Sequence, residues 1–196
     1  MVPLERYSLK RERDDRMMIH TLKNLLMPYE VEAITKENFD EVMDIYESNQ
    51  AFFILTEEKE IGKEDCMKDV DAIPPDFDIS QKIFTSIEAN NQKVAVLDML
   101  MGYPAESCLW IGLLLIHEAH KHKGLGRQII SAIEKAAKTE GYESVQLGVI
   151  EKNGKALSFW HMLGFEVIRE AKMEKEGSAS VKVIVMEKRI KQEESV

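Results

Sequence analysis

A short basic loop with two glycines is the part of the sequence best suited to chemistry. It runs from Lys121 to Arg127, follows an apolar run that ends at Ile116, and precedes an amphipathic helical pattern. Glycines let a backbone turn sharply and direct its N–H groups inward without obstruction from a β-carbon. The start of a helix adds unpaired N–H donors and a partial positive charge. The loop therefore predicts a phosphate-binding site, around which Lys121, Lys123 and Arg127 supply full charges.

The spacing of the loop does not fit two common phosphate-binding motifs. A Walker loop requires G-x-x-x-x-G-K-(S/T), which occurs nowhere in the chain. A dinucleotide fingerprint requires a third glycine three residues after Gly126, where Ile129 stands. Two glycines in a loop also fit a plain tight turn between a strand and a helix. The neighbouring elements are therefore needed to distinguish a phosphate-binding loop from such a turn.

Those neighbouring elements predict one domain that mixes strands and helices. Apolar alternation and turn residues indicate strands at 29–34, 82–89, 94–101, 109–116, 145–150, 165–172 and 181–186. Helical patterns occur from Phe39 to Tyr46, in the acidic segment that ends at Pro74, at 126–140 and at 154–163. The run 109–116 lacks polar alternation, which predicts a strand in the middle of a sheet and buried on both faces. Gly112 inside it indicates a bulge or a close backbone approach.

Two segments together resemble the GNAT (GCN5-related) N-acetyltransferase superfamily. The first signature, (Q/R)-x-x-G-x-(G/A), matches Lys121 to Gly126, with Lys121 where Gln or Arg is usual. The second, N-x-x-A-x-x-(F/L)-Y-x-x-x-G-F, resembles Asn153 to Phe165 and begins 27 residues after Gly126. Two independent motifs in the correct order and spacing make the resemblance specific, and it covers roughly Tyr29 to Lys188.

The resemblance implies an α/β (α+β) domain of the GNAT fold, with helices on both faces of a mixed, mostly antiparallel sheet that is splayed in the middle. The pantetheine arm of acetyl-CoA would lie in the splay, and the pyrophosphate would rest on loop amides. A backbone N–H near Gly112 would polarise the thioester carbonyl. The residues expected to contact acetyl-CoA are Leu114, Leu115, Ile116, Lys121, His122, Lys123, Gly124, Leu125, Gly126, Arg127, Asn153 and Trp160.

The implied activity is direct transfer of the acetyl group, in a ternary complex, to a primary amine of a small molecule or peptide. The sequence departs from the family pattern at one position that matters for this activity. Trp160 stands where the family has a Tyr that protonates the departing thiolate. An indole N–H does not give up its proton at neutral pH, and general acid catalysis is worth roughly 10²–10⁴-fold. We expect Trp160 to pack against the coenzyme. The alternative function is a catalytically weak acetyl-CoA sensor or an interaction module on the same fold.

The catalytic base is not evident from the sequence. His117 and Glu118, at the end of the apolar strand, are weak candidates, and both also fit a solvated loop. His117, His120 and His122 form an H-x-x-H-x-H pattern. We expect no metal there, because a loop that binds phosphate through its backbone does not converge its side chains on one point.

Composition limits the class of protein. The chain has 196 residues, of which 44% are hydrophobic and 31% charged, as expected of one globular domain. We divide it into an N-terminal helical leader (1–26), a GNAT domain (27–190) and a frayed tail (191–196). The leader either packs on the domain or supports a homodimer.

Two isolated cysteines and no apolar run long enough to span a bilayer predict a cytoplasmic protein without membrane contact.

The net charge of −9 is concentrated in one segment. From Lys36 to Ser80 there are fourteen Asp or Glu residues against four Lys, while the rest of the chain is nearly neutral. Nucleic-acid binding is disfavoured, because it requires a basic face. In the GNAT fold this segment borders the acceptor site, so a neutral to cationic amine is the expected acceptor. The other interpretation is a solvated helix face that improves solubility.

Overall fold

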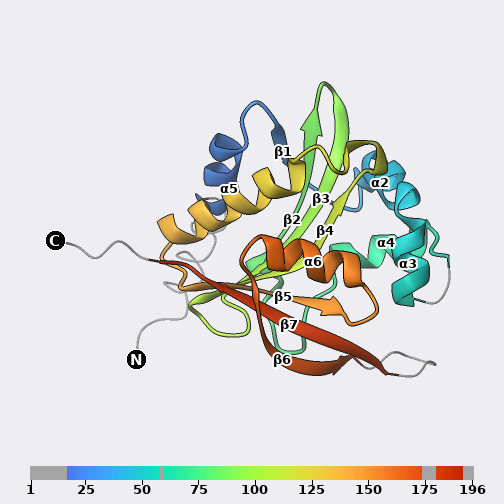
Figure 1. Ribbon diagram of the computed structural model, residues 1–196. Helices are drawn as coiled ribbons and strands as arrows, with labels where there is room; N and C mark the ends of the chain where they lie inside the picture. The colour runs from blue at the N-terminus through green and yellow to red at the C-terminus, as the bar shows by residue number, and fades with distance from the viewer. Residues whose placement is uncertain (1–16, 58–59, 174–179, 192–196) are drawn as a thin grey trace.

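A seven-stranded sheet forms the centre of the computed structural model, which describes residues 17–57, 60–173 and 180–191 (Figure 1). The strand order is β1-β2-β3-β4-β5-β7-β6. The strands are β1 (Glu30–Ala33), β2 (Lys82–Ala89), β3 (Gln92–Met101), β4 (Cys108–Ile116), β5 (Ser144–Ile150), β6 (Glu166–Met173) and β7 (Val181–Arg189). Every neighbouring pair is antiparallel except β4 and β5, which are parallel. The expected mixed, mostly antiparallel sheet is confirmed.

Helices cover both faces of this sheet. In Figure 1, α5 lies across one face of the central strands, while α2, α3 and α4 gather at the right. The helical segments are residues 17–25, η1 (Phe39–Val42), α2 (Met43–Ser48), α3 (Gln50–Glu57), α4 (Lys63–Met67), η2 (Lys68–Val70), η3 (Ile79–Gln81), η4 (Glu118–His120), α5 (Leu125–Thr139) and α6 (Gly154–Met162). Within the described ranges, no helix has the length and apolar character needed to cross a membrane.

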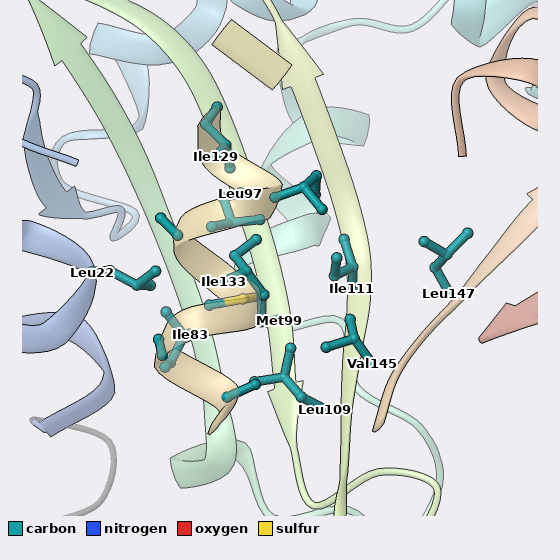
Figure 2. Close-up of a cluster of buried hydrophobic side chains, with 14 of the residues drawn as sticks. Leu22, Ile83, Leu97, Met99, Leu109, Ile111, Ile129, Ile133, Val145 and Leu147 are labelled. Carbon is teal, nitrogen blue, oxygen red and sulfur yellow. The ribbon is translucent and has the colours of Figure 1, made fainter. Parts of the chain in front are cut away.

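The larger of two hydrophobic clusters lies between the sheet and α5. Ile129 and Ile133 on α5 pack over Leu97, Met99 and other residues of the central strands (Figure 2). The face of α5 expected from the 3.6-residue period is thus the buried one. Full burial of each such side chain contributes about 1.5–3 kcal/mol to folding.

The helix at residues 17–25 belongs to the same cluster. Its Met18 and Leu22 are fully buried, and Leu26 just after it is nearly so. The part of the expected leader that the structure describes therefore packs on the domain. The remainder of that leader, residues 1–16, and residues 192–196 of the expected tail lie outside the described residues.

The second cluster lies on the opposite face of the sheet, under α2, α3 and α4. Its largest members are Phe39, Tyr46, Phe53 and Phe84, joined by Leu115 of β4. Tyr46 stacks on Phe53 with ring centroids 5.7 Å apart. The acidic segment is thereby anchored by an aromatic interior, and most of its described charged residues are exposed.

The β2–β3 hairpin has the turn that its sequence predicts. Asn90 and Asn91 have φ angles of 52° and 61°, in the left-handed region that Asn tolerates better than most residues. Two consecutive residues of this kind characterise the turn whose twist matches that of antiparallel strands.

The position of β4 in the middle of the sheet is confirmed, but its expected burial on both faces is met only in part, and Trp110 is already half-buried in its first half. Leu109 and Ile111 are buried, whereas Gly112 is exposed and Leu113 and Leu114 are half-buried. The reason is that β5 pairs with β4 only along Cys108–Ile111. Beyond that point the two strands separate, and the second half of β4 loses its cover on one side.

Candidate functional site

A β-bulge lies where β4 and β5 separate. Asp98 of β3 pairs with Leu113 and Met99 pairs with Ile111, which leaves Gly112 as an extra residue in β4. Ile111 is also the last residue of β4 that pairs with β5. The bulge indicated by Gly112 is therefore confirmed, and it lies at the apex of the splay.

The apex carries no side chain on either central strand. Gly148 follows the last paired residue of β5, and both Gly148 and Gly112 are exposed. A β-carbon on Gly148 would lie 2.9 Å from Cγ1 of Val183 on β7 and 3.5 Å from the Trp110 ring. Two glycines thus leave backbone accessible in the middle of the sheet.

The basic loop begins after β4 and turns into α5. His122 and Gly124 have φ angles of 60° and 88°, so two residues in the left-handed region reverse the chain there. No side chain caps the amino end of the 15-residue α5, so its first-turn N–H groups are available to an anion. His122, Lys123, Gly124 and Arg127 are exposed around it. The predicted anion site therefore has the required geometry.

Gly126 brings the two sequence motifs together. A β-carbon on it would lie 3.1 Å from Cδ1 of Ile116, at the end of β4, and 3.1 Å from Cζ of Phe159 on α6. Such contacts are tighter than normal packing, so a glycine allows the start of α5 to approach both neighbours. Residues from the loop and from the Asn153 to Phe165 segment thus share one side of the splay.

The backbone of Leu114, Leu115 and Ile116 lines the open side of β4. On one side these residues pair with Leu97, Val96 and Ala95 of β3. On the other side, no strand in the described part of the chain pairs with them. The carbonyl of Ile116 accepts a hydrogen bond of 3.0 Å from Nδ2 of Asn49, and an extended ligand with amide groups can form hydrogen bonds along the rest of such an edge.

Asn153 and Trp160 have roles within the protein itself. Oδ1 of Asn153 accepts a hydrogen bond of 3.1 Å from the backbone N–H of Ala156 and caps α6. Trp160 is only 8% exposed, and its ring centroid lies 5.0 Å from that of Phe159 and 5.1 Å from that of Phe165. Trp160 is a core residue in this structure.

His117 and Glu118 lie at the far end of β4 from the bulge. Nε2 of His117 is 3.1 Å from a carboxylate oxygen of Asp44 on α2. A hydrogen bond and the charge of Lys121 hold the pKa of Glu118 below its ordinary value. His117 follows Gly112 by five residues, which is about 16 Å along an extended strand. Both candidate bases are therefore placed beside the anion site and away from the apex.

The three histidines of the H-x-x-H-x-H pattern do not converge. The rings of His117 and His120 are 5.9 Å apart in an edge-to-face arrangement, and His122 is exposed. Among the residues that the structure describes, no three His, Cys, Asp or Glu side chains form a group that could hold a metal ion.

Sequence reasoning missed a buried ion pair beside the bulge. Nζ of Lys82 on β2 lies 2.7 Å from Oδ1 of Asp98 on β3, and both side chains are largely buried. Burial raises the pKa of Asp98 to about 6, although the charge of Lys82 and its hydrogen bond lower it. The available signal was a single carboxylate in the apolar run from Val94 to Met101.

Comparison with known proteins agrees with this geometry. The model of the acetyltransferase (GNAT) family matches residues 19–165. The chain therefore belongs to the GNAT acetyltransferase family. No curated protein sequence matches the chain significantly.

Solved acetyltransferase structures share the fold. An acetyltransferase from Thermus thermophilus is 22% identical, with a TM-score of 0.66 over 84% of this chain and 98% of that one. The ribosomal-protein-S18-alanine N-acetyltransferase of Escherichia coli is 11% identical, with a TM-score of 0.60 over 85% and 96%. The PaiA N-acetyltransferase of Thermoplasma acidophilum, solved in complex with coenzyme A, is 16% identical, with a TM-score of 0.57 over 83% and 99%.

Proposed function

We propose that the protein is an acetyl-CoA-dependent N-acetyltransferase that acts on a primary amine of a small molecule or peptide by direct transfer in a ternary complex. The observation that carries the proposal is the continuity of one strand. The unpaired half of β4 connects the bulge at Gly112 with the anion site at the start of α5. The thioester of acetyl-CoA would lie at the bulge, and its pyrophosphate would lie at the anion site.

The protein's own groups suit each part of acetyl-CoA. Amides from His122 to Arg127, with Lys121, Lys123 and Arg127, would hold the pyrophosphate. The open edge of Leu114 to Ile116 would pair with the pantetheine amides. When bound, acetyl-CoA supplies an activated acetyl group, and a backbone N–H of the bulge would stabilise the negative charge that develops on its carbonyl oxygen.

The charge of the structure supports a neutral to cationic amine as acceptor. The acidic helices α2, α3 and α4 lie on the face of the sheet opposite α5, which is the face toward which Asp98 and Leu113 are directed. Attraction between exposed charges is screened beyond a Debye length of about 8 Å at physiological ionic strength. The KM for a cationic acceptor should therefore rise with added salt, whereas a preference for an anionic acceptor would contradict this part of the proposal.

Coenzyme binding and transfer are tested separately. Acetyl-CoA should raise the melting temperature, because a ligand that binds only the native state stabilises it by mass action. Thiol release is then followed with putrescine, tyramine, alanyl and lysyl peptides, and glutamate as an anionic comparison. Stabilisation together with thiol release from at least one amine is the expected result. Stabilisation without any release favours the sensor, and the absence of both rejects the proposal.

The two cysteines support a cytoplasmic location, which we also propose. Cys66 and Cys108 are both buried and free. Buried thiols without a disulfide are usual in a reducing compartment. Fractionation of cells that produce the tagged protein tests the location, and recovery in the membrane or secreted fraction would contradict it.

A further inference from the structure

We infer that Asp98 is the carboxylate that binds the acceptor amine and takes up its proton during acetyl transfer, an assignment that rests on the transferase function proposed above. His117 and Glu118, the candidates from the sequence, lie beside the anion site instead. Of these three residues, Asp98 is the one whose ionisable group lies at the apex of the splay.

Contact with Gly112 places this carboxylate at the bulge. Oδ2 of Asp98 lies 2.7 Å, and Cγ 3.2 Å, from the point that a β-carbon on Gly112 would occupy. Only glycine permits this approach, and Gly112 is itself exposed. Any ligand that reaches the backbone of the bulge from this face of the sheet therefore comes beside Oδ2.

Lys82 holds the other carboxylate oxygen of Asp98, Oδ1, in place. Oδ1 accepts a hydrogen bond of 2.7 Å from Nζ of Lys82, which also donates to the carbonyl of Ala72 at 3.0 Å. The same Nζ lies 5.3 Å from the centre of the Phe84 ring. Three contacts thus hold Lys82, and its hydrogen bond to Oδ1 leaves Oδ2 of Asp98 beside Gly112.

Burial makes this carboxylate a proton acceptor near neutral pH. Lys82 lowers the pKa of Asp98, while burial and the charge of Asp69 raise it, and the result is about 6. Asp69 in turn accepts a hydrogen bond of 2.8 Å from the hydroxyl of Tyr46 on α2. Lys82 and Asp69 are thus the charged groups of the neighbouring elements that act on Asp98, and Tyr46 holds Asp69. Asp98 is ionised at pH 7 and only partly hydrated, as a general base should be.

A purely structural role explains these features less well. A buried ion pair is weak evidence for stability, because desolvation of the charges opposes their attraction. Such a pair would not require a bulge or a glycine beside it. Perturbed carboxylates are found preferentially at functional sites, and this one lies at the point where the family's coenzyme geometry predicts the thioester.

The transfer step balances with Asp98 in this role. A cationic acceptor first loses one proton to solvent; the neutral amine then donates a hydrogen bond to Oδ2, and its lone pair forms a bond to the thioester carbonyl carbon. The nitrogen becomes cationic and acidic as this bond forms, and its proton passes to Asp98. The carbon–sulfur bond then breaks, the departing thiolate takes a proton from solvent, and Asp98 releases its proton to solvent.

The experiment compares the pH dependence of kcat for the wild type, Asp98→Asn and Lys82→Met, with saturating acetyl-CoA and the panel amine that the wild type acetylates fastest. Asp76→Asn is the control, because it makes the same Asp-to-Asn change at an exposed carboxylate of the acidic segment, away from β3. The φ of 60° at Asp76 also suits Asn. Folding and acetyl-CoA affinity of every variant are measured first by thermal unfolding with and without the coenzyme.

The expected results separate a base from a structural residue. Wild-type kcat should rise with pH through about 6, and Asp98→Asn should lose this rise and about 100-fold in kcat while still binding acetyl-CoA. Lys82→Met should move the rise to higher pH, because Lys82 lowers the pKa of Asp98. A merely structural pair would not move the pH profile.

Each contrary outcome points to a different failure. If Asp98→Asn keeps the wild-type kcat and pH profile, Asp98 is not the base, although the transferase function stands. If Lys82→Met stays folded and active but keeps the wild-type pH profile, Lys82 does not act on the group that titrates and the inference is wrong. If the wild type binds acetyl-CoA but acetylates no amine, the inference and the transferase proposal both fall while coenzyme binding remains.

Discussion

Phe159 on α6 lies 3.1 Å from the point that a β-carbon on Gly126 of α5 would occupy, so the two motif segments of the fold meet at one glycine. We expect Gly126→Val to displace the start of α5 and to abolish stabilisation by acetyl-CoA. Overpacking of this kind costs typically about 1–3 kcal/mol, so the unliganded variant should also melt earlier. Thermal unfolding with and without acetyl-CoA measures both effects. Gly62→Ala is the control, because nothing lies within 4 Å of its β-carbon position. Normal coenzyme affinity in Gly126→Val would place the phosphates elsewhere.

Gly112→Ala should impair catalysis more than coenzyme binding. The new methyl group would meet Oδ2 of Asp98 at 2.7 Å and push the carboxylate away from the apex. We expect kcat to fall about tenfold or more, in line with partial loss of base catalysis. The double variant Gly112→Ala/Asp98→Ala removes the clash but leaves the buried Lys82 without its carboxylate, so it should stay destabilised and inactive. Recovery of activity in the double variant would count against a catalytic carboxylate.

The stability of the wild type relative to Asp98→Asn should fall as pH rises from 4 to 7. Burial raises the pKa of Asp98 from 3.8 to about 6, so the folded protein binds more protons than the unfolded chain between these values. The contribution of Asp98 is therefore most favourable below pH 3.8 and is lost as pH rises through 6. The shift corresponds to about 3 kcal/mol. Urea unfolding of both proteins across this range measures the change, and a constant difference would mean that the pKa of Asp98 is unshifted.

Removal of two exposed charges at the anion site should weaken acetyl-CoA binding and its salt dependence together. Hydrogen bonds to charged groups contribute about 1.5–3 kcal/mol, so Lys123→Gln and Arg127→Gln should each raise the Kd about tenfold or more. Calorimetric titrations at two salt concentrations measure the affinity and its slope. Lys135→Gln, an exposed lysine farther along α5, is the matched control. Equal losses in all three variants would indicate a general field effect and no phosphate site.

Replacement of Trp160 should separate packing from proton donation. Its indole packs between Phe159 and Phe165 in the core, so Trp160→Tyr and Trp160→Phe should both lower the melting temperature. If a phenol at this position protonates the departing thiolate, Tyr should give a higher kcat than Phe. We expect that order. Equal kcat values would leave Trp160 as a packing residue only, with water as the acid.

The sequence predicted those features that depend on local chemistry. The turn at Asn90 and Asn91, the bulge at Gly112 and the amphipathic α5 each follow from side chains that are neighbours in the chain. The anion loop belongs to the same group, because its glycines and its helix start are contiguous. Periodicity was misleading only in the second half of β4. An apolar run indicates the absence of polar neighbours, and it does not reveal that the adjacent strand turns away.

The pairing of Asp98 with Lys82 required long-range information. The hairpin turn suggests that 82–89 faces the strand of Asp98, but a register shift between Ile87 and Glu88 changes which residues stand opposite. Phe84 is the direct partner of Asp98, and Lys82 reaches it diagonally. The position of Oδ2 beside Gly112 depends in turn on the bulge in a third strand. Two strand registers, each with its own irregularity, must therefore be correct before this arrangement can be predicted.

The short pairing of β4 with β5 also has a consequence for hydrogen exchange. Beyond Ile111, amide protons of β4 that are directed toward β5 have no strand partner in the described chain, although they lie in the middle of a sheet. Such protons should exchange with deuterium as quickly as those of an outer strand, while their β3-facing neighbours exchange slowly. A coenzyme arm lying along this edge would behave as an eighth strand and slow their exchange. The protection pattern from Leu113 to Ile116 thus reports occupancy of the splay residue by residue, before any acceptor is known.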